Sequence, residues 1–138
     1  MLEARIEQHG AHDWITLAGK ASHEELLSLY RRSWLVTSAS LAEGWGLTLT
    51  EAAACGTPAV ATDVNGHRSS VIDGVTGVLV PLERLGDKLA DVLLDEPRRR
   101  ALADAALARA RTLTWEASAR GVLAGLHGQV MAKAGRRR

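Results

Sequence analysis

The chain has 138 residues, of which 46% are apolar, and this is enough for one domain with a buried core. Its 17 basic and 16 acidic residues nearly cancel, so the charge balance does not indicate a nucleic-acid-binding protein. Basic clusters at 98–100 and 136–138 contain no aromatic residues. We interpret them as solvated helix ends, with a patch for nucleic acid or an acidic membrane as the alternative.

The sequence contains no signal for export, membrane insertion or metal binding. Cys55 is the single cysteine, so we expect a small buried side chain in a reducing compartment. No apolar run reaches the roughly 20 residues of a membrane-spanning helix, and the N-terminus lacks a secretory core. His9 and His12 have no Cys or acidic cluster beside them, so we expect a loop and no metal site there. We predict a cytoplasmic protein, with peripheral attachment to the inner face of the membrane as an alternative.

Strands and helices alternate along the chain. The predicted strands cover residues 14–17, 34–37, 59–62 and 77–80, and the predicted helices cover 2–8, 22–32, 47–55, 83–94, 97–111 and a last segment from 114 onward. Short strands separated by helices of about ten residues are typical of a parallel, doubly wound sheet. We therefore predict an α/β fold in a single domain, residues 1–138, with C-terminal helices at 83–134.

Several helix ends carry specific signals. Ser22 and Glu25 form a capping box at the start of the second helix. Pro97 suits a first helical turn and Thr114 suits an N-cap. These signals fix where the helices begin better than periodicity alone does.

The segment 40–58 contains the strongest functional pattern. Glu43 and Glu51 are eight positions apart, and Gly44 and Gly46 lie between them, just before a predicted helix. Glycine lets the backbone approach a ligand, and the unpaired N–H groups at a helix start suit a phosphate or diphosphate. Two acceptors beside an anion site fit a ligand that has hydroxyls on both sides of a phosphate. A nucleotide sugar is such a ligand.

The run from Glu43 to Leu47, followed by residues 51–63, resembles the Glu-x7-Glu signature of family 4 of the retaining glycosyltransferases, which have the two-domain GT-B fold. The similarity continues at 15–19, 24–31, Gly66, 74–81 and 114–116. It implies a Rossmann-like parallel sheet flanked by helices, the C-terminal half of the GT-B fold, lacking its first two strands. Those strands would lie between 14–17 and 34–37, so the resemblance implies a gap in the sheet.

The resemblance also implies a role for each residue of the motif. Glu43 would contact the donor sugar and is the candidate catalytic residue, and Glu51 would contact the ribose. An exposed helix acid is the alternative for Glu51. The remaining donor-binding residues would be Gly44, Trp45, Gly46 and Leu47 at the diphosphate, and Gly19, Lys20 and Ala21 beside the base. The donor would be a UDP-, GDP- or ADP-linked sugar, with no cofactor or metal.

Other positions depart from the family pattern or carry no chemistry. Trp45 replaces the usual Phe, and Ser69 occupies the place of a frequent Glu. We interpret His67 as a surface turn residue, with approach to a ligand as the alternative. We interpret Trp115 as a packing residue.

We therefore expect the donor-binding half of a retaining glycosyltransferase that acts on an unknown acceptor. The alternatives are a non-catalytic nucleotide-sugar-binding subunit and an inactive fragment. In the family, the acceptor domain lies upstream of the point where this sequence starts, so we expect the chain alone to be inactive. We expect a missing N-terminal domain or a partner chain to complete it. Self-association and a rearrangement of the sheet are the alternatives. The last helix, with apolar residues Val122, Leu123, Leu126 and Val130, would cross onto the missing domain.

Overall fold

The computed structural model describes residues 2–135, so the basic cluster at 136–138 lies outside the described residues. Its centre is a parallel sheet of three strands in the order β1-β2-β3, made of β1 (Val36–Ser38), β2 (Ala59–Thr62) and β3 (Gly77–Val80). Val60 lies opposite Thr37 on one side and Val78 on the other. The predicted parallel α/β fold is therefore confirmed, and β2 is its fully buried central strand.

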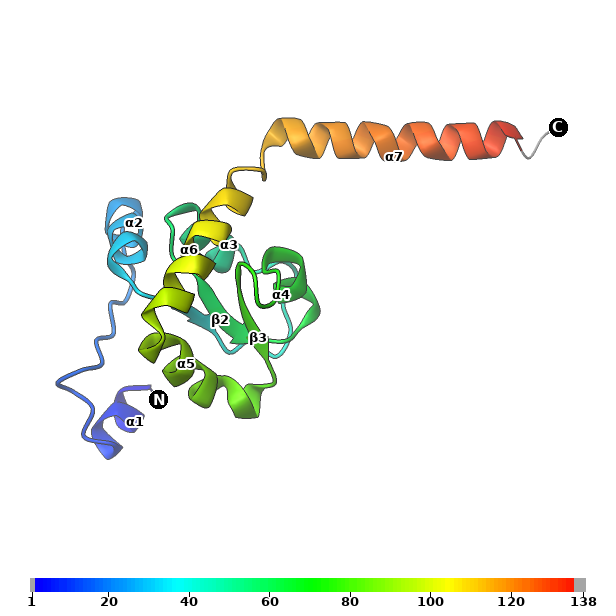
Figure 1. Ribbon diagram of the computed structural model, residues 1–138. Helices are drawn as coiled ribbons and strands as arrows, with labels where there is room; N and C mark the ends of the chain where they lie inside the picture. The colour runs from blue at the N-terminus through cyan, green and yellow to red at the C-terminus, as the bar shows by residue number, and fades with distance from the viewer. Residues whose placement is uncertain (1, 136–138) are drawn as a thin grey trace.

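Helices occupy most of the remaining chain (Figure 1). They are α1 (Leu2–Gln8), α2 (His23–Arg32), α3 (Leu47–Ala54), α4 (Asn65–Ser70), α5 (Leu85–Leu94) after a 3-10 turn at Leu82–Arg84, α6 (Glu96–Ala110) and α7 (Trp115–Gly135). The predicted helices are all present, with ends shifted by a few residues. Residues 65–70 form a helix where the sequence suggested only a sharp turn.

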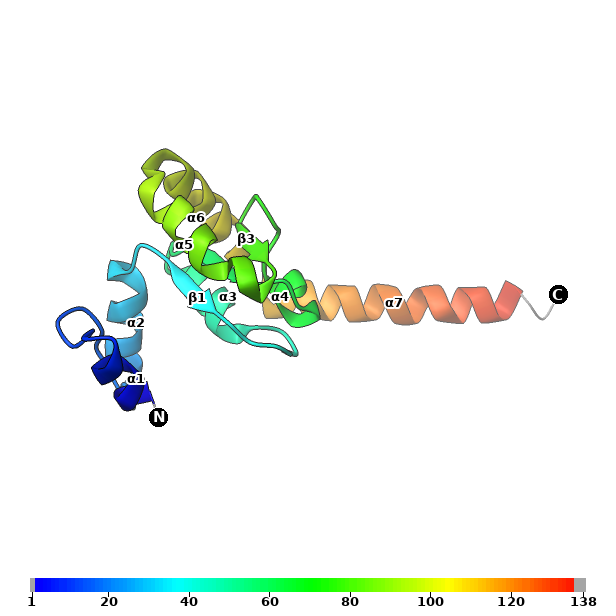
Figure 2. The same cartoon turned by 90° about the horizontal axis from the view of Figure 1, so that it is seen from below.

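The two faces of the sheet bury different side chains because successive strand residues point to opposite sides. Ala59 and Ala61 pack with Leu49 of α3 on one face. Val60 packs with Val92 of α5 and Leu102 of α6 on the other. Figure 2 shows α5 and α6 on one side of the strands and α3 and α4 on the other.

The predicted strand at 14–17 is wrong. This segment is irregular, with Trp14 74% exposed and Leu17 46% exposed. A strand needs a neighbour to accept its backbone hydrogen bonds. In the described part of the chain, the sheet ends at β1, which pairs only with β2, so residues 14–17 have no strand to pair with. Figure 2 shows helix α2 between this segment and β1.

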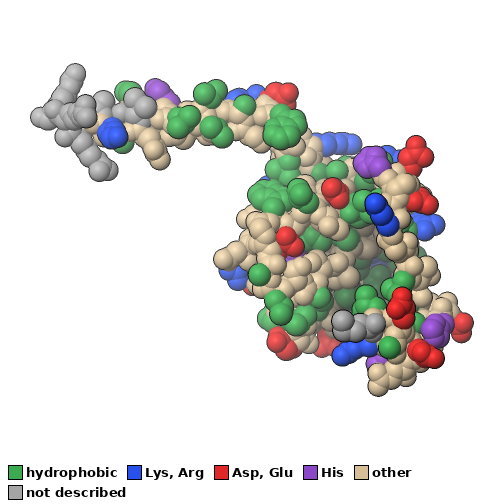
Figure 3. All heavy atoms as spheres, turned by 180° about the vertical axis from the view of Figure 1, so that it is seen from behind, with side chains coloured by type: hydrophobic (Ala, Val, Ile, Leu, Met, Phe, Trp, Pro, Cys, Tyr) green, Lys and Arg blue, Asp and Glu red, His purple; other side chains and the backbone are tan. Residues whose placement is uncertain are grey.

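The last helix extends away from the rest of the molecule (Figure 1). It begins as predicted, because the Thr114 hydroxyl accepts a hydrogen bond from the amide of Ala117 at 3.1 Å. Trp115 is 89% exposed, so the packing role expected for it is not fulfilled within the described part of the chain. Hydrophobic side chains line this helix in Figure 3. Leu123 and Leu126 are exposed, whereas the side chain of Val130 lies outside the described residues.

Cys55, at the end of α3, is partly exposed, so the burial expected for it is also wrong.

Candidate functional site

The candidate motif lies at the carboxyl edge of the parallel sheet. β1 ends at Ser38 and leads into a loop, 39–46, that ends at α3. The hydroxyl of Thr62, at the end of β2, donates to the carbonyl of Ser40 at 2.6 Å. This bond ties the loop to the edge where open α/β sheets bind their ligands.

The amino end of α3 offers unpaired amide groups. Gly46 is its N-cap, in the left-handed region at φ 82°, and makes no side-chain cap. Leu49 and Thr50 donate their amides to the Gly46 carbonyl at 3.1 and 3.3 Å. Within the described residues, the amides of Leu47 and Thr48 have no acceptor. These N–H groups and the positive end of the helix dipole together favour an anion.

The loop lies directly on α4, and glycine makes this approach possible. A Cβ atom on Gly66 would overlap the carbonyl group of Glu43 and lie 2.9 Å from its Cβ. A Cβ atom on Gly46 would lie 3.0 Å from the ring of His67 and 3.1 Å from the hydroxyl of Ser70. The positions of Glu43 and of the α3 amides therefore depend on the backbone of α4.

The Glu43 carboxylate is exposed and lies over its own loop. One of its oxygens accepts from the Ser40 hydroxyl at 3.5 Å, and the other accepts from the Gly44 amide at 3.3 Å. Both bonds are long, so the carboxylate can exchange them for ligand hydroxyls at little cost.

Glu51, in the second turn of α3, is held by a residue that the sequence analysis missed. The hydroxyl of Tyr30 in α2 donates to Oε2 of Glu51 at 3.1 Å. Burial of Tyr30, followed by its hydrogen bond to the Glu51 carboxylate, raises the pKa of the tyrosine. The carbonyl of Tyr30 in turn accepts from the Thr57 hydroxyl. The sequence analysis assigned no role to Tyr30, because its partner is 21 residues away.

Trp45 covers the first turn of α3. Its indole N–H donates to the Thr50 hydroxyl at 3.0 Å. With Leu47 and Thr50 it lines a pocket of about 630 Å³, closed on the other side by residues 112–118 at the start of α7. The motif therefore lies next to the helix that extends from the molecule.

The segment 19–21 lies elsewhere in this structure. Lys20 and Ala21 line a separate pocket of about 300 Å³ against α2, with Glu25 and Arg32 among its other residues. None of the residues 43–51 lines that pocket. The structure thus brings Glu43, residues 44–47 and Glu51 onto one loop-helix unit and places Gly19, Lys20 and Ala21 apart from it.

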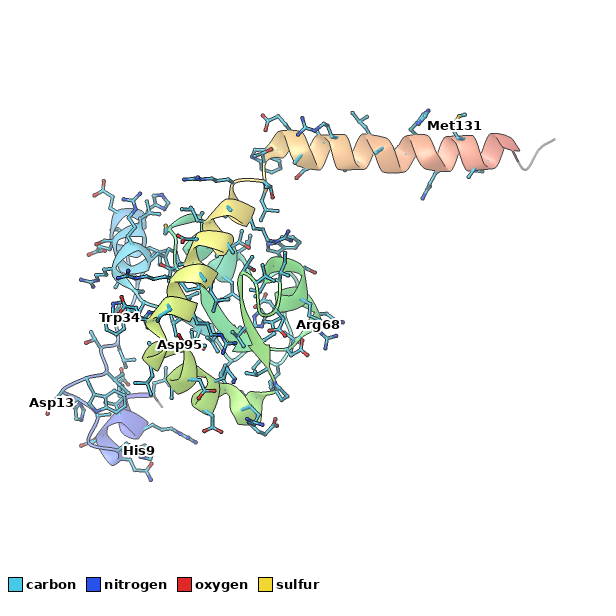
Figure 4. The ribbon with its side chains drawn as sticks, in the orientation of Figure 1. His9, Asp13, Trp34, Arg68, Asp95 and Met131 are labelled. Atoms are coloured by element: carbon cyan, nitrogen blue, oxygen red, sulfur yellow. The ribbon has the colours of Figure 1, made fainter. Side chains whose placement is uncertain are left out.

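His67 differs most from its predicted position. It was expected on the surface, but it is completely buried in α4. Its Nδ1 atom lies 2.7 Å from the carbonyl of Thr62. The adjacent Arg68 instead points outward and forms a two-bond ion pair with Asp63, at 2.6 and 2.9 Å (Figure 4).

We also searched the described residues 2–135 for metal-binding groups and for membrane-spanning helices. They contain no group of three or more His, Cys, Asp or Glu side chains that could hold a metal ion. None of their helices is long and apolar enough to cross a membrane.

Comparisons of the chain with known proteins all identify the same family. A family model described as "Glycosyl transferases group 1" matches residues 1–109. A D-inositol 3-phosphate glycosyltransferase of Segniliparus rotundus is 40% identical over 124 residues. This match covers 88% of the present chain but only 28% of the relative, so the chain spans less than a third of that protein.

Solved structures agree with this result. Sucrose-phosphate synthase from Thermosynechococcus elongatus superposes with a TM-score of 0.80 at 32% identity, covering 96% of this chain and 34% of that one. The C-terminal domain of a group 1 glycosyl transferase, LpcC, from Francisella tularensis gives 0.71 at 28% identity, covering 81% and 60%. Anabaena Alr3699/HepE, solved in complex with UDP-glucose, gives 0.72 at 26% identity, covering 79% and 30%.

The match to the family model and these similarities include both the sheet and the loop-helix unit that bears Glu43 and Glu51. The chain therefore belongs to the glycosyl transferases group 1 family, and its fold is that of the C-terminal half of a GT-B glycosyltransferase.

Proposed function

We propose that the chain binds the donor of a glycosyl transfer, a nucleotide-diphosphate sugar, with the diphosphate at the amino end of α3. The observation that carries this proposal is the pair of unpaired amides at Leu47 and Thr48, behind a glycine in the left-handed region. The structural similarity to a protein solved with UDP-glucose supports a UDP-linked sugar ahead of a GDP- or ADP-linked one.

The two carboxylates would bind hydroxyl groups on either side of the diphosphate. Glu43 would orient the donor sugar, since its present hydrogen bonds are long and replaceable. Glu51 would bind the ribose diol, a charge-assisted contact that also fixes orientation. Tyr30 would hold the Glu51 carboxylate in place, since its hydroxyl already donates to it.

The base would lie beside residues 19–21. Lys20 and Ala21 already line a pocket against α2, and α2 also carries Tyr30 next to Glu51. In this proposal, strands added at the free edge of β1 would bring Gly19, Lys20 and Ala21 closer to the donor site.

In a complete enzyme, we propose that the chain takes part in retaining glycosyl transfer. Holding the leaving diphosphate among backbone N–H groups would stabilise the charge that develops as the glycosidic bond breaks. Glu43 would position the sugar for attack by the acceptor. We assign no metal to these steps.

The acceptor would bind to a part of the enzyme outside this chain. The chain spans 28% of a relative at 40% identity, so an acceptor domain or a partner chain would supply the remainder. The same region would cover the free edge of β1 and the apolar side chains of α7. We further propose that residues 1–138 form a single cytoplasmic donor-binding domain.

Titration of the chain with UDP-glucose tests the donor site. We expect saturable binding that weakens at least tenfold in Glu51→Gln, because the neutral amide loses the charge-assisted contact with the ribose. The matched control is Glu24→Gln, an exposed acid in the first turn of α2 that lies outside the proposed site. Equal binding by both variants, or no binding by the unaltered chain, would refute the proposal.

The incomplete length of the chain also favours a second candidate, a non-catalytic nucleotide-sugar-binding subunit. Adding the N-terminal portion of a related enzyme in trans distinguishes the two. Turnover of UDP-glucose that depends on Glu43 would identify an enzyme, whereas binding without turnover would identify a subunit.

A further inference from the structure

His67 is a buried polar residue with half of its hydrogen-bonding capacity unused. Its side chain is 0% exposed. Nδ1 lies 2.7 Å from the carbonyl oxygen of Thr62, whereas Nε2 is buried and has no partner among the described residues. A leucine would fill such a site without leaving a polar atom unpaired, so packing alone does not account for a histidine here.

The surrounding bonds determine where the ring proton lies. A carbonyl oxygen can only accept, so the 2.7 Å contact places a proton on Nδ1. The Thr62 hydroxyl is not a competing donor to the ring, because it donates to the Ser40 carbonyl at 2.6 Å. In the neutral ring, Nε2 is therefore an unprotonated acceptor with nothing to accept from.

The unpaired side of the ring faces the amino end of α3. Cδ2, the carbon bonded to Nε2, lies 3.0 Å from the position that a Cβ atom would take on Gly46. Gly46 is the N-cap residue of α3, next to the unpaired amides of Leu47 and Thr48. The side chain thus packs against Gly46, the residue at which the proposed diphosphate site begins.

Charged groups from several elements lie near the ring. Arg109 of α6 reaches α4, donating to the Ser69 carbonyl at 3.3 Å, and the positive end of α3 faces the ring. Asp63 and Arg68 pair with each other. The Glu43 carboxylate is exposed and bonded to Ser40 and Gly44. A diphosphate bound at the amino end of α3 would add negative charge near the ring.

We infer that His67 is a further residue of the donor site: it takes up a proton when a diphosphate occupies the amino end of α3, and presents positive charge to it from beneath Gly46. This inference rests on the proposed donor site. Protonation of His67 would add a buried cation that forms only when the ligand is bound. It would also give the otherwise unpaired Nε2 a proton to share with the anion or with the loop that contains Gly46.

Nitrogen NMR of the full chain, labelled with ¹⁵N-histidine, tests this directly. UDP-glucose is the probe, because its diphosphate is a diester and does not itself titrate near neutral pH. In the free chain we expect one histidine with a protonated Nδ1 and an unprotonated Nε2. At saturation with UDP-glucose, both nitrogens of that residue should give signals of the protonated type. A change in packing alone would not produce this signature.

The variants His67→Gln and His9→Gln complete the test. His9 is exposed at the opposite end of the molecule from α4 (Figure 4). Because binding takes up a proton, the affinity of the unaltered chain should fall as pH rises through neutrality. His67→Gln should bind about tenfold more weakly at the acid end of that range and lose the pH dependence, and His9→Gln should retain both.

Three outcomes would overturn the inference. They are an unprotonated Nε2 in the saturated complex, an imidazolium already present in the free chain, and an unchanged pH dependence in His67→Gln. The NMR result decides the matter even if His67→Gln does not fold. Absence of UDP-glucose binding by the unaltered chain would instead refute the donor site itself, and this inference with it.

Discussion

Single residues determine how closely the loop that bears Glu43 approaches the rest of the molecule. The backbone of Glu43 lies against Gly66 so closely that no side chain fits between them. Gly46 is constrained twice, by its left-handed backbone and by the ring of His67 below it. The geometry of the Glu43 loop is thus set by two glycines from different elements.

Replacement of Gly66 by alanine tests this dependence. We expect Gly66→Ala to lower the free energy of unfolding by about 1–3 kcal/mol, because the new methyl group overlaps the Glu43 carbonyl and must displace the loop. UDP-glucose binding should weaken as Glu43 moves. The two effects are measured by chemical denaturation and by calorimetric titration.

Gly86→Ala is the matched control for that substitution. Gly86 lies in α5 with open space around its Cα atom, so alanine there should be neutral or stabilise by up to about 1 kcal/mol. Similar losses of stability in both variants would show that the approach of the loop to α4 is not what Gly66 provides.

At the scale of elements, α2 and α3 are joined through Tyr30 and Glu51. The tyrosine lies near the C-terminus of α2, and its hydroxyl bonds the carboxylate in the second turn of α3. The capping box of Ser22 and Glu25 fixes the start of α2, with both of its hydrogen bonds present. The position of Glu51, the residue proposed to bind the ribose, therefore depends on a neighbouring helix.

Tyr30→Phe should weaken this connection without unfolding the chain. We expect a loss of about 0.5–1.5 kcal/mol in unfolding free energy, since one hydrogen bond disappears and the ring remains. UDP-glucose affinity should fall several-fold as the Glu51 carboxylate becomes mobile. An unchanged affinity would show that Glu51 does not need this support.

The pKa of Tyr30 adds a pH-dependent test. Because burial and the Glu51 carboxylate raise this pKa, the stabilisation is complete below the ordinary tyrosine pKa of about 10 and is lost as pH rises through the higher value in the folded chain. Denaturation curves at increasingly alkaline pH should show this extra loss of stability. The Tyr30→Phe variant should lack it, which separates Tyr30 from the other groups that titrate in this range.

At the scale of the whole molecule, large aromatic side chains lie exposed on the surface. Trp14 is 74% and Trp115 is 89% exposed, one near the N-terminus and one at the start of α7. Trp115 lines one pocket with Trp45, Leu47 and Leu113, and exposed apolar side chains that gather in this way often mark contact surfaces. The chain spans 28% of a relative at 40% identity, and in the function proposed above these side chains would contact an added N-terminal domain or partner chain.

Tryptophan fluorescence tests this assignment. Trp34 and Trp45 are 65% and 38% exposed, so the emission of the isolated chain should be typical of solvated indole and readily quenched by acrylamide. Adding the N-terminal portion of a related enzyme should shift the emission to shorter wavelength, and Trp115→Phe should reduce that shift. A short-wavelength emission from the chain alone, in a sample that sediments as a monomer, would contradict the prediction.

The sequence by itself determined the fold class, the positions of the helices other than α4, and the loop-helix motif. These depend on local signals, namely the capping box, the glycines before α3 and the alternation of strands with helices, which need no knowledge of distant neighbours. The sequence could not show that 14–17 fails as a strand, because a strand exists only when another strand pairs with it.

Only the tertiary structure decided the remaining features. The sequence did not show that His67 is buried. It also did not show the bond between Tyr30 and Glu51 or the contact of Gly66 with Glu43, which join residues on different elements. No local pattern marks such pairs, because they arise from the packing of helices around the sheet. The chemistry proposed for Glu43 and Glu51 was readable from the sequence, whereas the residues that hold them in place were not.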